Sequence, residues 1–353
     1  MILTDSMLDA AFNFRMTEPW KELTDSDIFA VGISDGTIVY CSIMGHGGEH
    51  YSLGIYVGEE GFSTYLRTLM NSGADIVTSM QESIAFDCIN CDFMQAKDID
   101  NEVKTVVRCY AHKYGIKIPR KHGWIDFTRF MPYRGQWCIT NPKDAMIAEE
   151  ALRAATFFVL NFQDKSYADV GLDSMGEYPP VEGGKQIPFV TNENGIYHIN
   201  SIKTPPLQKS NPIVPLFTND ILIYKVKALP HTSTMECRLF HVPMPVHSKK
   251  CEQPVYPGIF IMIDQMDGKM QNPVVTTDYP QNPNIVLTDI AQQLCSLNKC
   301  PKEIIVNDDV TFALISDFCK KCGIKLTMSD DVLPDMEEAC FMMLQEMMMG
   351  EML

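Results

Sequence analysis

Residues 28–57 read "IFAVGISDGTIVYCSIMGHGGEHYSLGIYV", and this stretch decides the fold class. Three segments rich in strand-favouring residues lie within it, at 28–33, 38–44 and 52–57. Short glycine-containing segments separate them, and such segments are typical of turns between antiparallel strands. The stretch therefore predicts a β-meander of three strands.

The second turn contains His46-Gly-Gly-Glu49-His50, which matches the H-x-x-E-H pattern of a class of zinc proteases. That pattern needs a helix, because only a helix places residues four apart on one face, where both can reach one metal. Gly45, Gly47 and Gly48 would each destabilise a helix by roughly 1 kcal/mol relative to alanine. We therefore predict a solvated turn here and no catalytic zinc.

The meander opens an N-terminal α+β domain, which we expect to span residues 1–165. Helical spacing of apolar residues predicts helices at 61–70 and 99–114, and a strand is expected at 83–89. A longer helix is expected to start at Asn141-Pro142, since proline suits the first helical position. Residues 166–215 are rich in proline and glycine and are expected to form a connection. Within it, 187–190 and 196–202 predict a hairpin.

The C-terminal α/β domain is expected to span residues 216–353. Strands are predicted at 221–226 and 237–242, followed by a strand pair at 259–264 and 274–278. Helices and strands then alternate, which gives the order β-β-α-β-α-β-α and a mixed sheet. The whole chain is therefore predicted to be α+β, with a ribonuclease-H-like order as the alternative description of the C-terminal sheet.

Two stretches carry a resemblance to a known family. These are "IFAVGISDGTIVYCSIMGHGGEHYSLGIYVGEEGFSTYLRTL" (28–69) and "PKEIIVNDDVTFALISDFCKKCGIKL" (301–326). Both look like an uncharacterised family of bacterial proteins built from two domains of unknown function. The resemblance implies a bacterial, intracellular setting. It implies no activity and no catalytic residues, because none is established for that family.

Composition limits the classes of partner. The net charge is −16, which disfavours an extended nucleic-acid surface and anionic lipid, because both need clustered lysine and arginine. The one short basic cluster, Arg120-Lys121-His122, is too small to form such a surface. The first residues lack a basic signal region, and no apolar run is long enough for a membrane span. We expect a cytoplasmic protein with free thiols and no membrane association. Its partners are unknown, and a protein is one candidate.

Aspartates follow several of the C-terminal strands. Asp264 closes one expected strand, and Asp308 and Asp309 follow another. Carboxylates that gather at strand ends can hold Mg²⁺, and such sites support phosphodiester hydrolysis. The competing interpretation is that Asp309 and Asp331 are helix N-caps.

Four cysteines are spaced C-x4-C-x18-C-x2-C: Cys295, Cys300, Cys319 and Cys322. Structural Zn²⁺ sites use comparable spacing. Cys295 belongs to a helical stripe, however, and Cys300 precedes a proline rather than a glycine-rich knuckle. Buried thiols are the interpretation that the sequence favours.

A group of aromatic and basic residues lies between the expected helices, at Trp124, Tyr133, Arg134 and Trp137. Aromatic residues and arginine are enriched in protein interfaces. These four are the candidates for an interface or for the seam between domains.

Together these patterns favour a binding or interaction module without catalysis and without a cofactor. The alternative is a metal-dependent phosphodiester hydrolase that uses Asp264, Asp308 and Asp309.

Overall fold

The computed structural model describes residues 1–70, 76–162, 165–176, 179–208, 212–248 and 251–348. The chain divides into two compact units, Met1–Gln208 and Lys209–Leu353. The expected α+β class is confirmed in both units.

The first unit is built on an eight-stranded sheet of order β6-β5-β4-β3-β2-β1-β7-β8. Its strands are β1 Phe29–Gly32, β2 Ile38–Met44, β3 Ser52–Val57, β4 Cys88–Met94, β5 Trp124–Phe130, β6 Trp137–Cys138, β7 Gln186–Glu193 and β8 Ile196–Lys203. The expected meander is confirmed, because β1 to β6 pair in sequence order and antiparallel. The expected β7–β8 hairpin is also present, and β7 pairs in parallel with β1. Much of the expected connection 166–215 therefore belongs to the first sheet.

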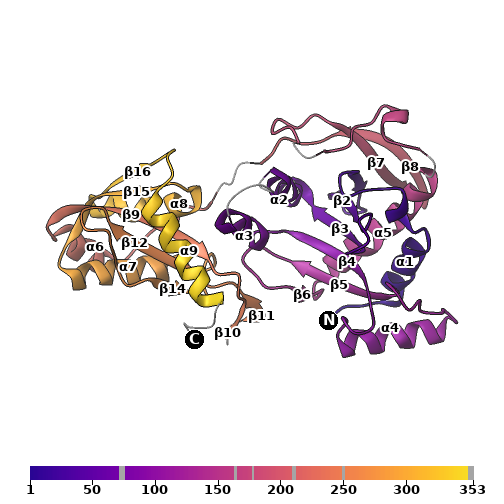
Figure 1. Cartoon of the computed structure of the whole chain (residues 1–353), viewed down its shortest axis with the longest axis horizontal. Helices are drawn as coiled ribbons and strands as arrows, with labels where there is room; N and C mark the ends of the chain where they lie inside the picture. Colours follow the sequence, from indigo (N-terminus) through magenta and orange to yellow (C-terminus); the bar gives the residue numbers. More distant parts are fainter. Residues whose placement is uncertain (71–75, 163–164, 177–178, 209–211, 249–250, 349–353) are drawn as a thin grey trace. The chain divides into compact units, whose positions relative to one another are not determined.

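Helices cover both faces of this sheet (Figure 1). The helices of the unit are α1 Asp5–Met16, η1 Pro19–Lys21, α2 Gly58–Met70, α3 Ile76–Ile84, α4 Asn101–Lys113, α5 Pro142–Phe162 and η2 Ala168–Val170. One core cluster joins α1, α4 and α5 to one face, and a second joins α2 to the other. The expected strand 83–89 is wrong in its position, since α3 continues to Ile84 and β4 begins only at Cys88.

The second unit contains a mixed sheet of order β13-β12-β9-β15-β16, with β14 also paired to β12. Its strands are β9 His231–His241, β12 Gly258–Asp264, β13 Lys269–Met270, β14 Val274–Thr276, β15 Cys300–Val306 and β16 Lys325–Met328, beside a separate hairpin of β10 Val246–Ser248 and β11 Cys251–Val255. Its helices are α6 Asp220–Lys227, α7 Pro283–Leu297, α8 Asp309–Cys322 and α9 Pro334–Met348. The predicted pairing of 259–264 with 274–278 is confirmed by β12 and β14.

The predicted strand at 221–226 is wrong, because these residues form α6. The Asn219 side chain caps this helix by accepting a hydrogen bond from the Leu222 N–H. Leu222, Ile223 and Val226 pack on the core, whereas Ile221 and Tyr224 are 70% and 76% exposed. The apolar residues thus follow a helical period, although their β-branched character suggested a strand.

Within the described residues, no helix combines the length and the apolar character needed to cross a membrane.

Candidate functional site

An open pocket of about 440 Å³ lies in the first unit, where three segments distant in sequence come together. Residues 15–21 contribute the end of α1 and η1, residues 45–51 contribute the turn between β2 and β3, and residues 121–122 precede β5. We call it the Trp20 pocket. Its lining consists of Arg15, Glu18, Trp20, Lys21, Gly45, His46, Tyr51, Lys121 and His122.

Aromatic rings in close contact line part of the Trp20 pocket. Trp20 is only 8% exposed and meets Tyr51 edge-to-face, with ring centroids 4.8 Å apart. The His122 ring lies 4.0 Å from the Tyr51 ring. Gly45 permits this packing, because a Cβ there would lie 2.8 Å from Tyr51 Cδ1 and 3.1 Å from Trp20 Cβ.

Arg15 ties the end of α1 to the segment before β5. Its Nε donates to the His122 carbonyl oxygen, and its Nη2 donates to the Lys121 carbonyl oxygen at 3.3 Å. Burial lowers the pKa of Arg15, and nearby Glu18 opposes that effect. The guanidinium remains charged, because an arginine stays protonated throughout the physiological pH range. Arg15 is therefore both a structural clamp and a fixed positive charge at the pocket.

The other cations differ in how far they are neutralised. Lys21 Nζ lies 2.5 Å from Glu18 Oε2, so the positive charge of Lys21 and the negative charge of Glu18 cancel. The exposed Lys121 ammonium makes neither a hydrogen bond nor an ion pair with any residue in the described part of the chain. Arg15 and Lys121 thus leave the pocket with a formal excess of two positive charges, in a chain whose net charge is −16.

Both histidines of the pocket are oriented by backbone carbonyl groups. His46 Nδ1 lies 3.1 Å from the Trp20 oxygen, and His122 Nδ1 lies 3.3 Å from the Phe93 oxygen. A carbonyl only accepts hydrogen bonds, so each Nδ1 carries the proton. Nε2 is then the ring nitrogen that remains for another partner, as an acceptor in the neutral ring and as a donor in the charged ring.

The backbone is strained at two lining residues. Glu18 and His122 have positive φ values of 47° and 50°, a region that residues other than glycine seldom occupy. Such conformations cost about 1–3 kcal/mol each and cluster at binding sites. Gly123 lets the segment fold back, because a Cβ there would lie 2.3 Å from the Pro119 carbonyl oxygen. The surrounding contacts therefore hold this pocket in a defined shape.

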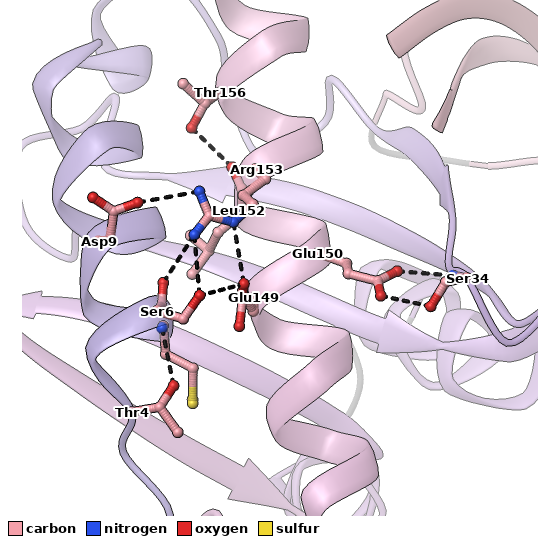
Figure 2. Close-up of polar contacts among 10 residues, drawn as sticks. Thr4, Ser6, Asp9, Ser34, Glu149, Glu150, Leu152, Arg153 and Thr156 are labelled. Atoms are coloured by element: carbon pink, nitrogen blue, oxygen red, sulfur yellow. Dashed lines mark hydrogen bonds and ion pairs between the residues drawn. The ribbon is translucent and has the colours of Figure 1, made fainter. Parts of the chain in front are cut away.

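Contacts with α5 fix the position of α1, which carries Arg15. Figure 2 shows Arg153 of α5 donating to Asp9 at 3.1 Å and to Glu149 at 3.2 Å. The Ser6 hydroxyl, at the start of α1, donates to the same Glu149 carboxylate at 2.5 Å. The start of α1 is thus held to α5, and the last turn of α1 places Arg15 at the pocket.

The structure separates the two histidines of the H-x-x-E-H stretch. The stretch is a turn between β2 and β3, as predicted, and His46 lines the Trp20 pocket. His50 instead faces β4, where its Nε2 lies 3.0 Å from Asp92 Oδ1. This hydrogen bond raises the pKa of His50 against the opposing effect of burial.

The candidate metal acids of the second unit do not lie together. Asp264 ends β12, which is antiparallel to β9, and its Cα partner is Met235. Met235 is also the partner of Ile304 on β15. Asp264 is therefore level with Ile304, two strands away, and Asp308 lies four residues beyond Ile304. At ~3.3 Å per residue and ~4.8 Å per strand, the two aspartates are roughly 16 Å apart.

Each of these acids has a local partner. The Lys299 ammonium donates to Asp264 at 2.8 Å, and the pKa of Asp264 is lowered because this bond and one from the Met266 N–H outweigh burial. Asp308 caps α8, with its Oδ1 accepting from the Thr311 N–H at 2.7 Å. The expectation that Asp309 caps this helix is wrong, since Asp309 is its first residue.

A second open pocket lies where β15 and β16 end. It is lined by Asn307, Asp308, Asp309, Met328, Ser329, Asp330, Asp331 and Val332. Nearby, Arg238 of β9 donates to Glu337 of α9 at 2.5 Å. Within the described residues, no three histidine, cysteine or acidic side chains have a geometry that could hold a metal ion.

The four spaced cysteines lie near one another in the second unit. Burial raises the pKa of Cys300 to about 12, with smaller effects from Cys322 and Cys295. Burial also raises the pKa of Cys322 to about 11 and that of Cys319 well above its usual value. In this arrangement these three are protonated thiols at neutral pH rather than thiolates, the form that binds metal.

The aromatic interface candidates border the β5–β6 edge of the first sheet. Trp124 begins β5 and has the Arg108 guanidinium 5.7 Å from its ring centroid, and Trp137 begins β6. Tyr133 and Arg134 lie in the connection between these strands, and all four are half-buried. Their role in an interface stays a prediction.

Sequence reasoning missed the Trp20 pocket although two of its parts were noticed. The His-Gly turn and the Arg120-Lys121-His122 cluster each border it, and each is too short to signal a site alone. Helix α1, which supplies Arg15, was not predicted. The hydrogen bonds that join Arg15 to Lys121 and His122 span 106 and 107 residues of sequence.

Two family models match the chain, one in each unit. Residues 5–174 match a domain of unknown function described as DUF7309, and residues 222–344 match one described as DUF6930. A search among curated proteins finds no match.

Two solved structures are similar to part of the chain. One is the HTLV-2 integrase catalytic core domain in complex with magnesium, at 17% identity and a TM-score of 0.23, covering 32% of this chain and 66% of that one. The other is the simian T-cell lymphotropic virus intasome in complex with PP2A regulatory subunit B56 gamma, at 12% identity and a TM-score of 0.23, covering 37% and 42%. The chain thus spans less than two thirds of either.

Proposed function

We propose that this chain, which joins a DUF7309 domain to a DUF6930 domain, is a binding module whose first unit holds a small anion in the Trp20 pocket. The observation that carries the proposal is the excess positive charge of Arg15 and Lys121 beside the buried Trp20 ring. Cations are scarce in this chain, which has 29 lysines and arginines against 45 acids. Their convergence from separate segments therefore needs an explanation, and an anionic ligand supplies one.

The geometry supports ligand binding. Cationic and aromatic side chains line one cavity. Both histidines have one nitrogen committed to a carbonyl group, which fixes the orientation of each ring. Rings held in a fixed orientation beside an open cavity support a preformed ligand site.

The test uses the fluorescence of Trp20 as a local probe. The chain has three tryptophans, so a Trp20→Phe variant identifies the part of the signal that belongs to the pocket. Inorganic phosphate, sulfate, succinate and citrate would be titrated at constant ionic strength. We expect at least one of them to change the Trp20 signal in a saturable way.

The matched variants are Lys121→Ala and Lys117→Ala. Both lysines are exposed and lie in the same segment, but only Lys121 lines the pocket. The response should be lost in Lys121→Ala and kept in Lys117→Ala. The proposal fails if no anion of the panel alters the signal, or if the response is the same in both variants.

A further inference from the structure

We infer that the anion held by the Trp20 pocket is a phosphate monoester, with its phosphate beside Lys121 and Arg15 and its organic group toward the Trp20 and Tyr51 rings. This inference rests on the proposed anion binding and narrows it to one chemical class. Three features of the pocket support this chemical class: its excess charge, the kind of donor that remains free, and its size.

The excess charge matches one phosphate monoester. Arg15 and Lys121 contribute two positive charges, because Lys21 is already paired with Glu18. A phosphate monoester carries about −1.5 to −2 at neutral pH, concentrated on three oxygens. A single carboxylate carries half of that, and a dicarboxylate spreads its two charges over separate groups.

The free donors also suit a phosphate. The fork of an arginine can donate two parallel hydrogen bonds to a carboxylate or to a phosphate. The Arg15 fork is partly occupied, since Nε and Nη2 donate to backbone carbonyl oxygens. Lys121 offers a point charge with three donors, an arrangement that suits phosphate and lacks the geometry of a fork.

The size of the pocket calls for an organic group. A phosphate ion occupies roughly the space of two or three water molecules, each of which takes up ~30 Å³ in the liquid. The Trp20 pocket has about 440 Å³. The remaining space is bordered by Tyr51, which is half-buried, and by the histidine rings. A compact, partly apolar group attached to the phosphate would fill it.

Four probes separate these features by calorimetric titration of the full chain. Phenyl phosphate and phthalate carry similar charge, but the charged group is a phosphate in the first and a pair of carboxylates in the second. Benzoate has one carboxylate on the same ring, and inorganic phosphate has no organic group. We expect phenyl phosphate to bind at least tenfold tighter than phthalate or benzoate, and more tightly than inorganic phosphate.

Variants connect this preference to the pocket. Lys121→Ala should weaken phenyl phosphate binding by roughly tenfold to a hundredfold, the usual effect of losing a hydrogen bond to a charged group. Lys117→Ala should bind like the unaltered chain, and circular dichroism of both variants checks that they fold.

The outcomes distinguish the two proposals. Phthalate or benzoate binding as tightly as phenyl phosphate, with the same dependence on Lys121, overturns the phosphate inference and leaves anion binding intact. Inorganic phosphate binding as tightly as phenyl phosphate overturns the assignment of an ester. If none of the four probes binds, or binding does not depend on Lys121, the phosphate-ester inference fails, and the response of Trp20 fluorescence to sulfate, succinate and citrate decides whether anion binding fails as well.

Discussion

His50 Nε2 lies 3.0 Å from Asp92 Oδ1, and this ion pair ties the turn before β3 to the neighbouring strand β4. The next residue along the chain, Tyr51, lines the Trp20 pocket. One side of the turn thus borders the candidate ligand site, while its last residues are held to the sheet by a charge that depends on pH.

The first prediction concerns this pH dependence. The hydrogen bond to Asp92 raises the folded-state pKa of His50 above its unfolded value, so folding favours the protonated ring. The resulting stability is fully present below the unfolded pKa and is lost as pH rises through the folded pKa. Because the His50 side chain is 60% exposed, we expect less than about 1 kcal/mol.

The measurement is the free energy of unfolding of the unaltered chain and of His50→Gln, at pH 5.5 and at pH 8.5. The variant should be less stable at the lower pH and nearly equal at the higher pH. A difference between the two proteins that is the same at both pH values would contradict the prediction.

The second prediction concerns Asp126, which is the Cα partner of Asp92 on the adjacent strand. Burial raises the pKa of Asp126, and the Asp92 and Asp100 carboxylates add to this, against a bond from the Phe127 N–H. Ionisation of Asp126 is therefore less favourable in the folded state than in the unfolded chain. Asp126→Asn should stabilise the protein at pH 7 by up to about 1 kcal/mol, because like charges directly opposite destabilise a strand pair.

Urea unfolding checks this prediction, with pH as the control. The gain from Asp126→Asn should disappear near pH 3, where the carboxyl group of the unaltered protein is neutral as well. A gain that persists at pH 3 would have to come from something other than charge.

The third prediction concerns the turn glycines. Gly45 has φ +128°, and a Cβ there would lie 2.8 Å from Tyr51 Cδ1, so Gly45→Ala should cost about 1–3 kcal/mol. Gly47 lies in the same turn, and a Cβ there would have no heavy atom within 4 Å. Gly47→Ala should therefore change the melting temperature little. Equal losses in the two variants would show that the Trp20–Tyr51 contact does not constrain the turn.

The fourth prediction concerns the start of α8. Asp308→Ala removes the side chain that accepts from the Thr311 N–H, and losing such a cap typically costs about 1 kcal/mol. Asp309→Ala removes only an acidic residue from the first turn, an effect of a few tenths of a kcal/mol. Hydrogen exchange at the Thr311 amide should accelerate in Asp308→Ala and barely change in Asp309→Ala. Faster exchange in Asp309→Ala than in Asp308→Ala would show that Asp309, rather than Asp308, caps α8.

The sequence predicts the fold best where pattern and turn agree. The ranges 38–44 and 52–57 match β2 and β3 residue for residue, because each run of strand-favouring residues is followed at once by a glycine, Gly45 after β2 and Gly58 after β3. Prediction from the sequence fails where residue type favours a strand but a helix cap and core burial favour a helix. Residues 221–226 are rich in isoleucine and valine, yet the Asn219 cap and the burial of Val226 on the core produce a helix.

The Trp20 pocket could not be predicted from the sequence in the same way. Arg15 and Lys121 meet only because α1 packs on α5 and the segment before β5 folds back at Gly123. No local pattern encodes that meeting, since it depends on tertiary contacts across more than a hundred residues. The arrangement of the candidate acids could not be derived from the sequence for a related reason. Their convergence depended on strand direction, and the antiparallel placement of β12 separates Asp264 from Asp308.

The parallel pairing of β1 with β7 has a consequence for how the first unit is made. On the ribosome, β1 emerges with β2 soon after it as one neighbour, but its other neighbour begins only at Gln186. At ~5–20 residues per second, translation takes roughly 10–30 s to pass from β1 to β7. Throughout that interval one edge of the nascent sheet is unpaired, and unpaired edges recruit other strands. The growing chain is therefore most exposed to aggregation and to binding by chaperones until β7 has been synthesised.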